Sequence, residues 1–131
     1  MPQQLAAITY LVHDYDEAIG WFTNKLGFTL LEDTRLSETK RWVRVASTAG
    51  GANLLLAKAE GKIQIAAVGQ AAGGRVAFFL HTDDFASTHA RLWAAGVVFR
   101  EQPRQEPYGM VAVFEDVYGN GWDLIEPSCK K

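Results

Sequence analysis

The chain has a single cysteine, Cys129, among its 131 residues, so it cannot form an internal disulfide. Small secreted folds that depend on disulfides are therefore excluded, and a reducing compartment is favoured. We expect a cytoplasmic protein in which Cys129 is a bystander near the end of the chain.

A strong charge of either sign and a long apolar run are also lacking. Thirteen Lys and Arg residues against 15 Asp and Glu residues give a formal net charge of −2, which leaves no basic footprint for nucleic acid. No run approaches the roughly 18 apolar residues of a membrane span. The segment Met1–Leu5 does not lead from charged residues into an apolar stretch, so we expect neither a signal peptide nor a membrane partner.

What the chain does have is a repeat. The apolar run Ile8–Val12 leads through a short turn into a helix pattern that ends at Gly27. The run Val76–Leu80 leads in the same way into a helix pattern that ends at Gly96. Half a chain of this size cannot bury a full core alone, so the repeat predicts two modules that pack on each other or on a partner chain. Small ligands favour the seam between such modules.

The periodicity predicts the order βαβββ twice within a single domain, 1–131. Module one, about 1–60, is expected to contain the helix Tyr15–Lys25 and the strands Leu5–Val12, Phe28–Glu32, Arg41–Ala46 and Ala52–Ala57. Module two, about 75–131, is expected to contain the helix Asp84–Ala95 and the strands Arg75–His81, Val97–Glu101, Met110–Glu115 and Gly121–Glu126. The connector, about 58–75, has room for a short helix over Ile63–Val68, and Gln102–Gly109 is expected to be a loop.

Two motifs resemble a known family. The first comprises Val12, Asp14-Tyr15, Ala18, Trp21-Phe22 and Leu26-Gly27-Phe28. The second comprises Tyr108-Gly109, Val111, Val113-Phe114, Asp116, Gly119-Asn120, Trp122-Asp123-Leu124 and Glu126. Together they resemble the vicinal-oxygen-chelate superfamily of glyoxalases, bleomycin-resistance proteins and extradiol dioxygenases. The resemblance implies an α+β fold of two βαβββ modules, whose curved mixed sheets enclose a cavity, and it implies homodimers among small members.

The resemblance also implies one divalent metal, held by His, Gln or Glu at four inward-facing strand positions. In this chain those positions fall on Ala7, near Leu54, on Ala77 and on Asp123. Aliphatic side chains offer no lone pair to a metal. We therefore expect no metal and no cofactor. The alternative is a relocated site, in which His13 and His81 at the strand ends join Asp123.

The candidates for ligand binding are Thr9, Trp42, Arg44, Phe79, His81, Tyr108 and Asp123. Strand alternation places Thr9, Phe79 and His81 on the faces of the expected metal positions, whereas Trp42 and Arg44 share a face of another strand and Tyr108 follows a proline-flanked loop. Asp123 is interpreted either as a base or clamp for a donor group, or as the partner of a nearby Arg or His. Arg44 either binds an anionic group or pairs with Glu32 across strands. Trp42 is a stacking wall or a core residue, Tyr108 a lid or a strand-entry aromatic residue, and Phe79 a lining residue.

Two functions remain open from the sequence. The first is metal-independent binding of a small amphipathic organic molecule, for which the bleomycin-resistance branch of the resembled family is the precedent. The second is a lyase, isomerase or dioxygenase-type enzyme that uses Asp123 and His81 as an acid/base pair or as relocated metal ligands. A third alternative is an interaction module with a collapsed cavity. A homodimer is expected in each case, because half-chain modules leave sheet faces and edges to cover.

Overall fold

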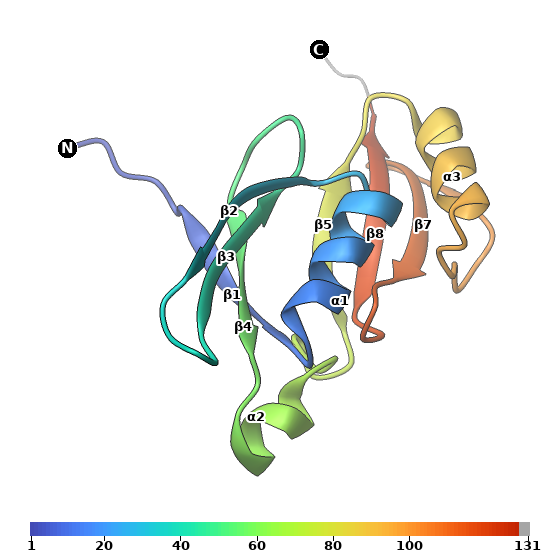
Figure 1. The fold of residues 1–131 in the computed structure, drawn as a ribbon. Coiled ribbons are helices and arrows are strands. Elements are labelled where there is room, and N and C mark those ends of the chain that lie inside the picture. The colour runs from blue at the N-terminus through green and yellow to red at the C-terminus, as the bar shows by residue number, and fades with distance from the viewer. Residues whose placement is uncertain (129–131) are drawn as a thin grey trace. The chain divides into compact units, whose positions relative to one another are not determined.

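The computed structural model describes residues 1–128, and Cys129 lies outside the described residues. The chain divides into two compact units, Met1–Gly69 and Gln70–Lys131. Each unit holds one four-stranded mixed sheet, with strand order β1-β4-β3-β2 in the first unit and β5-β8-β7-β6 in the second (Figure 1). The predicted α+β class with two curved-sheet modules is confirmed.

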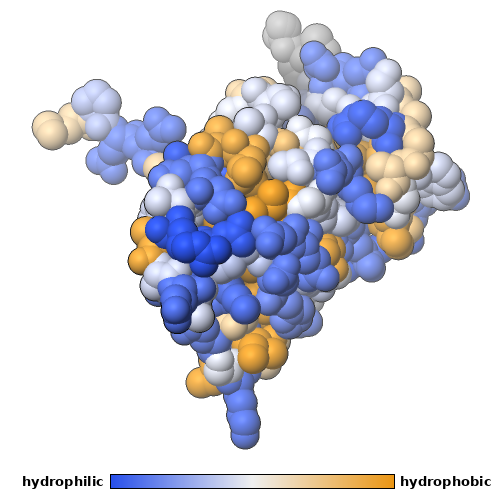
Figure 2. All heavy atoms as spheres, viewed as in Figure 1, coloured by the Kyte–Doolittle hydropathy of each residue, from blue (hydrophilic) through white to orange (hydrophobic). Residues whose placement is uncertain are grey.

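In the first unit one parallel strand pair, β1 with β4, completes an otherwise antiparallel sheet. Its elements are β1 (Ala7–Val12), α1 (Tyr15–Gly20), η1 (Trp21–Lys25), β2 (Thr29–Arg35), β3 (Arg41–Ala46), β4 (Asn53–Lys58) and α2 (Gly61–Ala67). The helix α1 contacts β3 and β4, and η1 continues it as one turn of π-helix. Hydrophobic side chains reach the surface at the α2 end of this unit, where Ile63 and Ile65 are exposed (Figure 2).

Local signals in the sequence explain where the first helix begins and ends. The Asp14 carboxylate accepts a hydrogen bond of 2.8 Å from the backbone N–H of Glu17, which caps the N-terminus of α1. Gly27 ends the helical segment with a positive φ of 83°, a conformation that glycine adopts without steric cost. The buried face of the sheet packs Tyr10, Val43 and Leu56 against this segment, with the Tyr10 and Phe22 rings edge to face at 5.3 Å.

The second unit repeats the plan, with β5 parallel to β8 and the remaining pairs antiparallel. Its elements are β5 (Val76–His81), α3 (Phe85–Ala94), β6 (Arg104–Glu106), β7 (Gly109–Glu115) and β8 (Gly121–Pro127). The helix α3 contacts β8 and buries Phe85 and Leu92. Its N-cap is Asp84, which accepts from the backbone N–H of Ser87 at 3.1 Å. No helix among residues 1–128 is both long enough and apolar enough to cross a bilayer.

A buried aspartate organises the hairpin between β7 and β8. Asp116 is only 6% exposed, and its carboxylate accepts hydrogen bonds from the backbone N–H groups of Tyr118 and Asn120 and from the indole Nε1–H of Trp122 at 2.9 Å. Asn120 in turn accepts from the backbone N–H of Ala71 at 3.0 Å. The hairpin is therefore held by a hydrogen-bond network centred on one carboxylate.

One predicted strand was wrong. Val97–Glu101 forms no strand apart from an isolated bridge between Phe99 and Phe114, and the edge strand β6 lies further on, inside the segment expected to be a loop. The physical reason is that a side-chain carboxylate, rather than the backbone carbonyl of a neighbouring strand, accepts a hydrogen bond from β7. The Glu101 carboxylate accepts from the backbone N–H of Val113 at 2.9 Å, so that donor on β7 is not available to a pairing strand.

Candidate functional site

The sheet of the first unit has one face covered by helices and one open face. The register pairs Thr9 with Leu55 and Arg44 with Leu55, so these three side chains lie on the same face. Trp42, two residues before Arg44, also lies there and is 42% exposed. Their sequence neighbours Tyr10, Val43 and Leu56 point to the helices and are buried, which accounts for the alternation along β1, β3 and β4.

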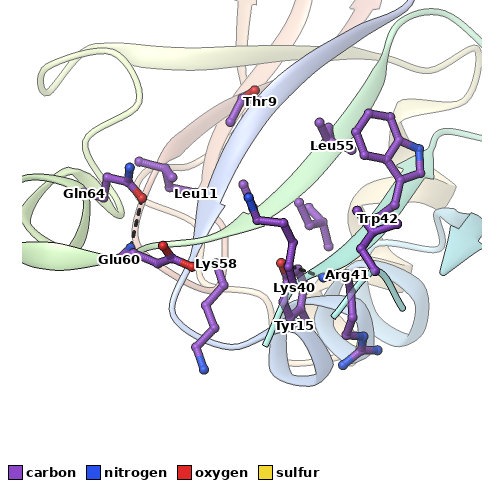
Figure 3. Close-up of a pocket in the computed structure, with 13 residues that line it drawn as sticks. Thr9, Leu11, Tyr15, Lys40, Arg41, Trp42, Leu55, Lys58, Glu60 and Gln64 are labelled. Atoms are coloured by element: carbon purple, nitrogen blue, oxygen red, sulfur yellow. Dashed lines mark hydrogen bonds between the residues drawn. The ribbon is translucent and has the colours of Figure 1, made fainter. Parts of the chain in front are cut away.

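The open face carries a pocket of about 560 Å³. Two of the predicted site residues, Thr9 and Trp42, line it. The floor is aliphatic, from Leu11, Leu55 and Ala57. The other lining residues are Tyr15, Leu36, Lys40, Arg41, Leu56, Lys58, Glu60 and Gln64. In Figure 3 the indole of Trp42 stands beside Leu55 as one wall of the pocket.

Hydrogen bonds fix the end of the pocket nearest to α1 and α2. The Tyr15 hydroxyl accepts from the backbone N–H of Arg41 at 3.2 Å, which ties the start of α1 to β3. On the other side, the Gln64 side-chain oxygen accepts from the backbone N–H of Glu60 at 2.9 Å (Figure 3). These contacts hold polar groups at the rim while the floor stays apolar.

Arg41 at the pocket rim forms ion pairs, whereas Lys40 and Lys58 do not within residues 1–128. Arg41 pairs with Asp33 at 2.7 Å and with Asp16 at 3.0 Å, and its guanidinium lies over the Tyr15 ring at 5.0 Å. Hydrogen bonding to Asp33 raises the pKa of Arg41, and the same pair lowers the pKa of the Asp33 carboxyl. Within residues 1–128, Lys40 and Lys58 make no ion pair. In Figure 3, Lys58 points away from Trp42 and Thr9.

Arg44 lies on the open face but outside the pocket lining. Its guanidinium pairs with Glu32 at 3.1 Å and donates to the Asn53 side-chain oxygen. This is the cross-strand pairing that the sequence allowed as the alternative to anion binding. Arg44 therefore links β2, β3 and β4 across the open face of the sheet.

The second unit places its predicted site residues on one face of β5 and β8. Phe79 pairs with Asp123, and Asp123 pairs with Val113, so the three side chains lie side by side. His81, two residues after Phe79, shares that face and is exposed. Asp123 is 8% exposed, and no group within residues 1–128 hydrogen-bonds to its Oδ1. Burial raises the pKa of the Asp123 carboxyl; Arg104 opposes this shift and Glu101 adds to it.

The cation near Asp123 is already occupied. Arg104 pairs with Glu101 at 3.1 Å and also pairs with Glu106. A hydrogen bond to Tyr108, followed by these two carboxylates, raises the pKa of Arg104. Tyr108 is exposed beside this cluster, at the turn into β7. The structure thus brings Tyr108 to Arg104, while the Oδ1 oxygen of Asp123 has no hydrogen-bond partner among residues 1–128.

The comparisons with known proteins agree with this architecture. The model of the Glyoxalase/Bleomycin resistance protein/Dioxygenase superfamily matches residues 4–124. The chain belongs to this superfamily. An uncharacterized protein of Shewanella frigidimarina is 47% identical over 133 residues, which cover 100% of this chain and 98% of that protein.

Two solved structures are similar over almost the whole chain. UcmS2 is 29% identical, covers 96% of this chain and 99% of its own, and has a TM-score of 0.82. TnmS3, an antibiotic binding protein from Streptomyces sp. CB03234, is 26% identical, covers 97% of this chain and 98% of its own, and has a TM-score of 0.76. The superfamily membership inferred from the two motifs is confirmed.

Membership raises the question of the superfamily's usual divalent metal. Ala7 and Ala77 offer no donor, and Leu54 is buried on the helix-covered face, so β4 presents Asn53 and Leu55 to the open face instead. The structure thus corrects the position expected near Leu54. Among residues 1–128, no three His, Cys, Asp or Glu side chains gather closely enough to hold a metal ion. These residues do not fit a metal held in the usual way of the superfamily, and the absence of a metal stays a prediction.

Several pocket residues were not singled out from the sequence. Leu11 and Ala57 follow from the alternation that located Thr9, so the same signal was sufficient to find them. Tyr15, Lys40 and Gln64 come from the start of α1, from the segment before β3 and from α2. Periodicity carries no information about which loops and helix ends reach the edge of a sheet.

Proposed function

We propose that this protein binds a small amphipathic organic molecule without covalent chemistry, in the pocket on the open face of the first unit. The observation that carries the proposal is the pocket itself, with about 560 Å³ of space, a tryptophan wall and an aliphatic floor. Ligand sites in proteins span roughly 300–1,000 Å³ and combine apolar walls with a few polar groups.

The chemistry of the lining defines the ligand class. Trp42 is a broad, partly exposed surface on which an aromatic or other flat apolar body can stack. Leu11, Leu55 and Ala57 supply apolar contact below it. Thr9, Lys40 and Gln64 offer hydrogen-bond groups around the edge, which suit a molecule with oxygen substituents.

The similarity to TnmS3 supports the same proposal. That protein is described as an antibiotic binding protein, and it matches nearly all of this chain. We therefore take aromatic and peptide-like antibiotics as the first class to test. Sequestration of such a molecule needs only affinity, and no catalytic group in this pocket is required for it.

The test is a titration of the purified protein with a panel of aromatic and peptide-like antibiotics, followed by tryptophan fluorescence and by calorimetry. A ligand of this pocket should change the emission of Trp42, and Trp42→Ala should weaken its binding about ten- to hundredfold. Trp93→Ala is the matched control, because Trp93 is also exposed but lies on α3 in the second unit. Absence of binding across the panel, or equal affinity in Trp42→Ala, would overturn the proposal.

A further inference from the structure

The second unit contains a polar group that its own fold leaves unsatisfied. Asp123 sits in the middle of β8 with 8% of its surface exposed, and its Oδ1 is buried with no hydrogen-bond partner in residues 1–128. Buried carboxylates are ordinarily paired or hydrogen-bonded, because an unpartnered one loses its solvation and gains nothing in return. Asp116, on the same hairpin, shows the ordinary case with its complete set of donors.

The charges around Asp123 favour a cation. Arg104 is nearby, but its guanidinium is engaged by Glu101, Glu106 and Tyr108. With Asp123 ionised, three carboxylates (Asp123, Glu101 and Glu106) would face the single positive charge of Arg104. The local balance is then negative, and an additional positive group that reached Asp123 would be attracted rather than repelled.

The face beside Asp123 is open and aromatic. Phe79 is the direct neighbour of Asp123 across the β5–β8 pair, and 63% of its surface is exposed. An ammonium group beside a phenyl ring gains a cation–π contact, and an apolar body attached to it can cover the ring. The same two side chains therefore offer an acceptor and a hydrophobic surface to one molecule.

We propose that Asp123 and Phe79 form a binding site for a protonated amine on an aromatic or apolar body, in which the ammonium group donates to the Asp123 carboxylate. Both residues belong to the second unit, whereas the pocket walled by Trp42 belongs to the first, and the inference does not rest on the proposed function.

Three matched probes test the site on the whole protein: 2-phenylethylammonium, the neutral 2-phenylethanol and the anionic 3-phenylpropionate. Binding is followed by backbone amide shifts. The amine should shift the amides of Phe79, Val113 and Asp123, and it should bind about tenfold or more tightly than the alcohol. The carboxylate should not bind there.

Substitutions at the two proposed contacts locate the bound amine. Asp123→Asn should weaken amine binding about ten- to hundredfold, while Asp83→Asn, which removes an exposed carboxylate before α3, should leave it unchanged. Phe79→Ala alters a mostly exposed side chain, keeps the fold, and should also weaken the amine. Trp42→Ala should not, which keeps the outcome distinct from a failure of the antibiotic-binding proposal.

Three results would overturn the inference. The first is amine shifts confined to the Trp42 pocket, the second is equal affinity in Asp123→Asn, and the third is equal affinity for amine and alcohol.

Discussion

Two buried aspartates on one hairpin should respond in opposite directions to the same substitution. Asp116 and Asp123 are 6% and 8% exposed, and both lie in the second unit. Asp→Asn changes neither the shape nor the size of the side chain appreciably, and each variant moves the formal net charge from −2 to −1. The effect of total charge on stability is therefore the same in both variants, and the difference between them reports the local environment.

The magnitudes follow from the hydrogen bonds. In Asp116→Asn the amide group replaces one acceptor oxygen, so the indole N–H of Trp122 or a backbone N–H loses a charged acceptor. A hydrogen bond to a charged group contributes about 1.5–3 kcal/mol, and the donor left behind is buried, so we expect a loss of about 3 kcal/mol. In Asp123→Asn no hydrogen bond is lost at Oδ1 and a buried charge is removed, so we expect a gain of about 1–2 kcal/mol.

Urea denaturation followed by circular dichroism measures both changes. The gain in Asp123→Asn corresponds to a rise in Tm of about 3–8 °C for a chain of this size. A variant Asp123→Asn that is less stable than the parent would refute the reasoning, because it would mean that the carboxylate has a stabilising partner. If Asp116→Asn were as stable as the parent, the reasoning would also fail, because the hydrogen bonds to the Asp116 carboxylate would then contribute nothing to stability.

The raised pKa of Asp123 also predicts how the unfolding free energy depends on pH. Because burial raises the folded-state pKa of Asp123 above the value of 3.8 typical of an unfolded chain, the unfolded state releases this proton first as the pH rises. The Asp123 contribution to stability therefore falls from pH 3.8 upward until the folded-state pKa has been passed, and it stays low at neutral pH. The difference in unfolding free energy between Asp123→Asn and the parent should grow over that window and be smallest below it.

Three further predictions concern the backbone, the metal and the assembly. Gly109→Ala should cost about 2–5 kcal/mol in urea denaturation, because the added Cβ would lie 2.1 Å from the Glu126 carbonyl oxygen at a φ of +146°. In Gly119→Ala the added Cβ has no atom within 4 Å, so the variant should lose only about 1–2 kcal/mol of stability because of the positive φ. Equal losses of stability in the two glycine variants would contradict the steric argument. Elemental analysis of dialysed protein should find far less than one divalent metal per chain, and a stoichiometric metal would contradict the donor argument. Sedimentation at micromolar concentration should give twice the chain mass of 14.5 kDa, and a mass of 14.5 kDa would rule out the dimer.

Alternation along strands made part of this architecture predictable. Thr9 and Trp42 both line the pocket, and each lies inside a strand whose buried residues, such as Tyr10 and Val43, are strongly apolar, so alternation alone places them on the opposite face. The helix caps at Asp14 and Asp84 are predictable for a similar reason, since a cap depends on residues within one turn of it.

Contacts between distant segments were not predictable. Periodicity places Asp123 inside a strand, but it does not show that the Oδ1 oxygen of Asp123 is buried with no hydrogen-bond partner among residues 1–128. The displaced edge strand β6 has the same origin, because the Glu101 side chain takes the backbone N–H of Val113, twelve residues away. Hydrophobic periodicity does not show when a side chain accepts a backbone hydrogen bond that a neighbouring strand would otherwise accept.

The metal position expected near Leu54 lacks a free ligand atom even after it is corrected by one residue. Counting from Gly50 points to Leu54, but Leu54 is buried under the helices and the open-face position beside Ala7 is Asn53. An amide oxygen is a legitimate ligand for a hard cation. Here, however, that oxygen accepts a hydrogen bond from the Arg44 guanidinium, which places a fixed positive charge at the position a metal would need. The corrected register thus replaces an aliphatic side chain at this position with an amide oxygen that already accepts a hydrogen bond from Arg44, so the argument against a metal ligand there is unchanged.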